Sequence, residues 1–144
     1  MLTKLSVTDD VLTTLVAPLG ELRSATALTG GMFASTYRVD LADERQVVVK
    51  IVSADTDRLL QYERGILATE AAIYRVAAGQ VPVPTVLHED FSRSLVAGDA
   101  VVASFLSGTP WHGLTLSEEQ TATARANLGG AMAAMHRITG ERFG

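Results

Sequence analysis

The sequence predicts an α+β fold with five strands and three helices. Short runs rich in β-branched residues between Leu22 and Val52 indicate three antiparallel strands. Apolar residues at helical spacing over Leu59–Ala78 indicate a helix. Two more runs, Thr85–Glu89 and Ala100–Leu106, are typical of strands. A helix is also predicted near each end of the chain.

The composition is that of a globular protein. The chain has 144 residues, of which 47% are hydrophobic and 19% charged, which excludes a disordered tail, a collagen and a coiled coil. The formal net charge of −4 has the wrong sign for nucleic acid or an anionic membrane surface. The chain has no cysteine, so disulfides and thiolate nucleophiles are excluded. No segment resembles a signal peptide or a membrane helix, and we expect a cytoplasmic protein.

The first half of the chain is predicted to form a short helix and then three strands. Thr8 precedes an apolar pattern that stops at Pro18 and Gly20, which are start and stop signals of a helix. The middle strand alternates apolar and polar residues, so one of its faces is predicted to be buried: Tyr37, Val39 and Leu41 are the apolar set.

The second half begins with the helix over Leu59–Ala78. Its predicted buried arc contains Leu59, Leu60, Ile66, Leu67, Ile73, Tyr74 and Ala77. The prolines in Val81–Pro84 predict an extended connector. The run Ala100–Leu106 is apolar on both faces, as in the middle of a sheet.

The last helix is predicted from Ser117 to about Thr139. Ser117 and Gln120 form a capping-box pattern at its start. Its segment Ala124–Ile138 is apolar on most sides, which is typical of a helix buried against other chain. We therefore expect self-association through this segment wherever nothing else covers it.

Lys50 is the one charged residue in the run Val47–Val52. Glu63 and Glu70 lie seven residues apart, so both fall within the apolar arc of the helix over Leu59–Ala78. Because a buried charge is costly unless it is paired, we predict that Lys50 pairs with Glu70 rather than with Glu63. The alternative is that these side chains reach water at the rim of the core. The double glycine Gly30–Gly31 lies between two strands, where backbone amides approach a phosphate or simply form a hairpin turn.

In this order the features resemble the small lobe of the protein-kinase-like fold and, within it, the aminoglycoside phosphotransferase family of antibiotic and choline kinase-like enzymes. The resemblance spans residues 27–144. It depends on Leu28–Gly31, Tyr37–Val39, Val48–Lys50, Tyr62–Gly65, Thr69–Ala71, Val81–Pro84, Phe105–Pro110, Met135, His136 and Gly140.

The resemblance implies a fold and a division of the chain. Residues 1–105 would form a nucleotide-binding small lobe, a five-stranded antiparallel sheet with one packed helix. Residues 106–144 would form the hinge and the first helical segment of the large lobe, which would be truncated here.

The resemblance also implies roles for individual residues. Gly30, Gly31 and the following residues to Ser35 would cover the nucleotide phosphates. Lys50 would hold the α- and β-phosphates and Glu70 would orient Lys50. Backbone groups of Ser104, Phe105 and Leu106 would bind adenine. The loop departs from the glycine-rich pattern of protein kinases at Met32, Phe33 and Ala34.

The implied activity is transfer of the γ-phosphoryl of ATP, with magnesium, to a hydroxyl of a small-molecule acceptor. The family's His-Gly-Asp catalytic loop and later metal-binding Asp are absent from the sequence, so we expect no catalytic or metal-binding residue here and no activity of this chain alone. If a base is nevertheless present, Asp90 and Asp99 are the first candidates. The alternatives are a non-catalytic nucleotide-binding or oligomerising module and an unrelated α+β domain.

Overall fold

The computed structural model describes residues 4–29, 31, 33–55 and 64–140. A five-stranded sheet has the order β1-β2-β3-β5-β4, and every adjacent pair is antiparallel. This confirms the predicted α+β class and the central place of β5. The elements are α1 (Asp9–Val16), β1 (Leu22–Leu28), β2 (Ala34–Leu41), β3 (Gln46–Ser53), α2 (Ile66–Ala77), β4 (Val86–Asp90), β5 (Gly98–Ser104), the 3-10 turn η2 (Trp111–Gly113) and α3 (Glu118–Met135).

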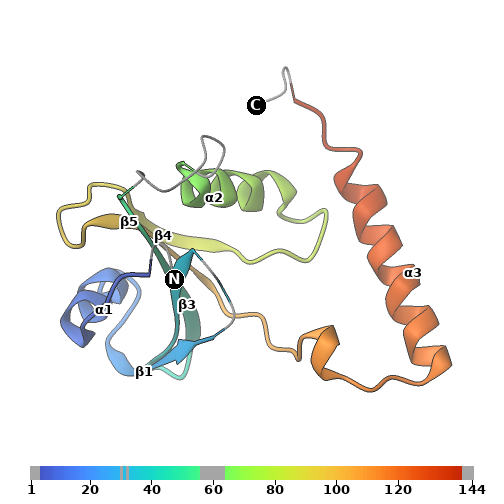
Figure 1. Cartoon of the computed structure of the whole chain (residues 1–144), viewed down its shortest axis with the longest axis horizontal. Helices are drawn as coiled ribbons and strands as arrows, with labels where there is room; N and C mark the ends of the chain where they lie inside the picture. The colour runs from blue at the N-terminus through green and yellow to red at the C-terminus, as the bar shows by residue number, and fades with distance from the viewer. Residues whose placement is uncertain (1–3, 30, 32, 56–63, 141–144) are drawn as a thin grey trace.

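The main core lies between α1 and one face of the sheet (Figure 1). Leu12, Leu15 and Val16 of α1 are fully buried there. The sheet contributes alternate residues of its three central strands, because successive side chains of a strand point to opposite faces. They are Val39, Leu41, Val47, Val49, Ile51, Ala100 and Val102.

Helix α2 covers the other face of the sheet. Leu67 and Ala71 of α2 pack with Val52 of β3 and Val101 of β5 in a second, smaller core. Figure 1 shows α1 and α2 on opposite sides of the sheet. The sheet therefore has one helix on each face, and α2 packs on the face to which Val52 and Val101 belong.

Two details of the predicted α2 are wrong. Arg64 and Gly65 form a turn, and the helix begins at Ile66, because Gly65 has a left-handed backbone with φ of 68°. Ile66 and Ile73 are exposed, although both were placed in the buried arc. Leu67 and Ala77 of that arc are buried as predicted, and Ala71, one turn after Leu67, is buried with them. The predicted residues 59–63 of this helix, Glu63 included, lie outside the described residues.

One buried carboxylate, Asp40 of β2, is held by hydrogen bonds. It accepts them from the Gln46 side-chain amide at 2.6 Å and the Ser24 hydroxyl at 2.8 Å. These donors favour the ionised form and lower the pKa of Asp40, with smaller help from the positive charge of Arg38.

Helix α3 stands away from the sheet (Figure 1). Its predicted capping box is present, since the Ser117 hydroxyl accepts from the Gln120 N–H while the Gln120 side chain accepts from the Ser117 N–H. The helix ends at Met135 instead of Thr139 and has no buried residue; Leu128 and Met132 are about half exposed. Over the described part of the chain, no helix combines the length and the apolar character needed to cross a membrane.

Candidate functional site

A cavity of about 300 Å³ lies on the face of the sheet that α2 covers. This volume is at the lower end of the range of small-molecule sites, roughly 300–1,000 Å³. Its walls come from β1, β2, β3, α2 and β5, together with Pro84 before β4 and the two residues that follow β5. The lining residues are Leu28, Thr36, Val48, Lys50, Leu67, Glu70, Tyr74, Pro84, Val101, Ala103, Ser104, Phe105 and Leu106.

The register of the sheet explains why these side chains meet. Thr36 of β2 is paired with Lys50 of β3, and Lys50 is paired with Val101 of β5. In the next row on the same face, Val48 is paired with Ala103. Residues directly opposite on adjacent strands share a face, so Lys50 lies in an otherwise apolar or neutral row.

The predicted partner of Lys50 is confirmed. Lys50 Nζ donates a hydrogen bond to Glu70 Oε1 and forms an ion pair with it. Both side chains are about 30% exposed at the cavity. An ammonium has three N–H donors, so the bond to Glu70 leaves two for an anionic ligand. The pair can thus present a fixed positive group to a phosphate.

Tyr74 is a member of the site that the sequence did not reveal. Its hydroxyl donates a hydrogen bond to the same oxygen of Glu70, and its ring centroid lies 5.9 Å from Lys50 Nζ. Burial and the hydrogen bond to Glu70 raise the pKa of Tyr74 well above its usual range, so the phenol remains a donor. The signal was its spacing, since Tyr74 follows Glu70 by four residues.

The predicted hinge forms one end of the cavity. The Ser104 N–H donates to the Thr85 carbonyl at 2.9 Å, and the Ser104 hydroxyl accepts from the Thr85 N–H at 2.9 Å. The Phe105 N–H points to the Gln46 carbonyl at 3.4 Å. Within the described residues no hydrogen bond of the Leu106 backbone is found. Of these three residues, Leu106 is therefore the one whose N–H has no hydrogen-bond partner within the described part of the chain.

The glycine loop joins β1 to β2 near the cavity. Gly30 and Met32 lie outside the described residues. Gly31 is exposed, and an added Cβ would meet the Ala34 carbonyl oxygen only at 3.8 Å, so the fold itself does not require glycine there. The Ser35 hydroxyl donates to the Leu5 carbonyl at 2.8 Å. Ser35 is buried within β2, its side chain points to the α1 side of the sheet, and it does not line the cavity.

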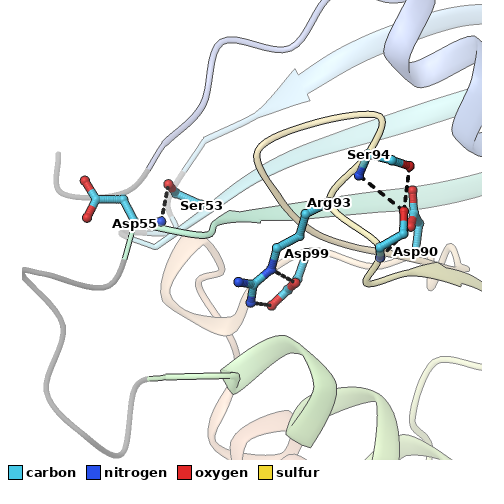
Figure 2. Close-up of polar contacts among 7 residues, drawn as sticks. Ser53, Asp55, Asp90, Arg93, Ser94 and Asp99 are labelled. Carbon is cyan, nitrogen blue, oxygen red and sulfur yellow. Dashed lines mark hydrogen bonds and ion pairs between the residues drawn. The ribbon is translucent and has the colours of Figure 1, made fainter.

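The acidic residues at the turn between β4 and β5 are engaged with neighbours, as Figure 2 shows. The guanidinium of Arg93 binds both oxygens of Asp99, at 2.8 and 3.2 Å. Asp90 accepts from the Ser92 N–H at 2.8 Å, and hydrogen bonds from the Ser92 hydroxyl and then from this N–H lower the pKa of Asp90. Among the described residues no group of three or more acidic or histidine side chains is placed to hold a metal ion.

Several solved structures share the fold. The aminoglycoside phosphotransferase APH(4)-Ia superposes with a TM-score of 0.65 at 16% identity, over 92% of this chain and 40% of that one. A thermostable mutant of that enzyme, in a ternary complex with AMP-PNP and hygromycin B, gives 0.64 at 18% identity over 92% and 40%. The ternary complex of another such mutant with ADP and hygromycin B gives 0.61 at 18% over 88% and 38%.

The chain thus spans about two fifths of the length of these enzymes. No curated protein sequence matches it. The pattern of one protein family does match, namely the phosphotransferase enzyme family, and the match runs over residues 24–144. It includes most of β1, all of the other four strands, the Lys50–Glu70 pair and the predicted hinge. On that coverage, the chain belongs to the phosphotransferase enzyme family.

Proposed function

We propose that the cavity binds ATP and that this chain is the nucleotide-binding portion of a kinase for a small-molecule hydroxyl. The observation that carries the proposal is the Lys50–Glu70 pair at a cavity whose other end is the Ser104–Leu106 hinge. A nucleotide has a planar base at one end and an anionic chain at the other, and this cavity offers a partner for each.

The walls between these ends suit an adenine ring. Leu28, Val48 and Ala103 give apolar surfaces, and the free N–H of Leu106 would supply one directional hydrogen bond. Lys50 would then offset charge on the α- and β-phosphates, while Glu70 keeps its ammonium aimed. Support comes also from the structures of similar fold that were solved with ADP or AMP-PNP.

Phosphoryl transfer needs a group that orients the acceptor hydroxyl and, in kinases, magnesium. When bound, magnesium would neutralise charge on the β- and γ-phosphates. The described residues do not fit it, because they contain no group of ligands placed for a metal, and we assign no step to it. We therefore expect binding of ATP without transfer by these 144 residues.

Equilibrium dialysis with radiolabelled ATP tests binding, and incubation with ATP, magnesium and a panel of aminoglycosides, choline and sugars tests transfer. Saturable binding without transfer is the expected result, and absence of saturable binding would overturn the proposal. Transfer that is lost in Lys50→Ala would show that a base is present, with Asp90 and Asp99 the first to replace. A reading frame that continues past Gly144 into a His-Gly-Asp segment favours the kinase over a non-catalytic module.

A further inference from the structure

The Lys50–Glu70 pair has a third member at the cavity. Glu70 Oε1 accepts two hydrogen bonds, one from Lys50 Nζ and one from the Tyr74 hydroxyl. Glu70 and Tyr74 lie one turn apart on α2, so the helix presents them together on one side. A carboxylate held by two donors on one oxygen has fewer rotamers available than one held by a flexible lysine alone.

Tyr74 also interacts with Lys50 directly. The ammonium lies 5.9 Å from the ring centroid, within the range in which a cation is attracted to the face of an aromatic ring, about 6 Å. Both interactions of Tyr74 act at the same ammonium, one directly and one through the carboxylate. Because the phenol keeps its proton, it donates to Glu70 throughout the neutral pH range.

We propose that Tyr74 is a positioning residue, whose hydroxyl fixes the Glu70 carboxylate and thereby the direction of the Lys50 ammonium. The idea that this arrangement serves to bind nucleotide phosphates rests on the proposed function. The contacts among Tyr74, Glu70 and Lys50 do not depend on it. Removing the hydroxyl should leave α2 folded, since Leu67 and Ala71 anchor the helix, but should loosen Lys50.

The chain is suited to a direct test because Lys4 and Lys50 are its only lysines. With 15N-labelled lysine, the side-chain signal of Lys50 is identified by its loss in Lys50→Arg. Slow exchange of the ammonium protons with water reports its hydrogen bond. In Tyr74→Phe we expect exchange at least about threefold faster and ADP binding about fivefold weaker. Tyr37→Phe is the matched control, because Tyr37 lies outside the cavity lining.

A double-mutant cycle separates positioning from general loss of packing. If Tyr74 acts through Glu70, then Tyr74→Phe should add no further change to Lys50 exchange in a Glu70→Ala background, which has no side-chain acceptor at position 70. Equal exchange rates in Tyr74→Phe and Tyr37→Phe, or additive effects in the cycle, would overturn the proposal. Failure of the wild-type chain to bind ADP would overturn the proposed function, while Lys50 exchange would still decide the role of Tyr74.

Should Tyr74→Phe not fold, the contact is tested from the other side. In Glu70→Ala the Tyr74 hydroxyl loses its acceptor, so the 13Cζ signal of Tyr74 at neutral pH should differ from that of the wild type. An unchanged signal would show that the hydroxyl and the carboxylate do not interact, and the proposal would fail.

Discussion

Replacing Lys50 with methionine should remove most of the affinity for ATP. Methionine keeps an unbranched side chain of similar length but has no charge and no N–H donor. Two donors of Lys50 are left after its bond to Glu70, and a hydrogen bond to a charged group contributes about 1.5–3 kcal/mol. Because the Lys50 side chain is 31% exposed, solvent screening favours the lower end, about 2 kcal/mol for the residue. This corresponds to about 30-fold weaker binding.

Thermal unfolding with increasing ATP measures this loss. At 100 times its dissociation constant a ligand stabilises the folded state by about 2.7 kcal/mol. A 30-fold weaker variant at the same ATP concentration would gain only about 0.9 kcal/mol. At about 3 °C per kcal/mol for a chain of this size, the wild type should gain about 8 °C and Lys50→Met about 3 °C. Each shift is taken from the variant's own ligand-free melting temperature.

Lys4→Met is the matched control, because it removes the same charge outside the cavity lining. It should keep the full shift of about 8 °C. If Lys50→Met shows the wild-type shift as well, then Lys50 does not contact the nucleotide. The ion pair with Glu70 would in that case be structural, and the cavity would need another explanation.

Three further predictions concern stability and self-association. Gly98→Ala should destabilise the chain by about 1–3 kcal/mol, because the added Cβ would lie 2.4 Å from a carbonyl oxygen of β3. Gly129→Ala on the exposed helix α3 should be neutral or stabilising. Urea unfolding of the two variants measures the difference. Because Gln46 and a neighbouring hydroxyl lower the pKa of Asp40, the stability advantage of the wild type over Asp40→Asn should be present at neutral pH. It should shrink below about pH 4, as denaturation at each pH would show. The exposed apolar residues of α3 should cause self-association that Leu128→Glu reduces, and a wild-type monomer at high concentration in sedimentation would contradict this.

The Lys50–Glu70 pair was predictable because each member breaks a strong local pattern. A lysine inside the apolar run of β3 and a glutamate on the inner side of α2 are both costly alone, so burial itself indicates their pairing. Tyr74 breaks no pattern. A tyrosine fits an apolar helical pattern because its ring is apolar. Its hydroxyl reaches Glu70 only when the helix is formed.

The buried side of α2 could be predicted only in part from its apolar residues, since Leu67 and Ala77 are buried but Ile66 and Ile73 are exposed. Ile66 and Ile73 are as apolar as Leu67, and a helix with apolar residues around much of its circumference does not define one inner side. Packing against the sheet determines which side of α2 is buried, because Val101 of β5 contacts Leu67 and Ala71. The side-chain hydrogen bond of Ser35 could also not be predicted from the sequence. The alternation of side chains along a strand predicts that Ser35 and Thr36 point to opposite faces of the sheet. The hydrogen bond from Ser35 to Leu5 depends in addition on the path of the N-terminal segment.

The cavity separates binding from catalysis in physical terms. Under the proposed function, the phosphates would be held by the charge and the two remaining N–H donors of Lys50, which the register of the sheet places between Thr36 and Val101. Catalysis needs in addition a group that contacts the attacking hydroxyl. The carboxylate in the cavity, Glu70, already accepts from Lys50 and Tyr74, and a base so engaged is poorly placed to take a proton. Glu70 is thus better suited to hold Lys50 than to react, and under the proposed function the acceptor would be oriented by other residues.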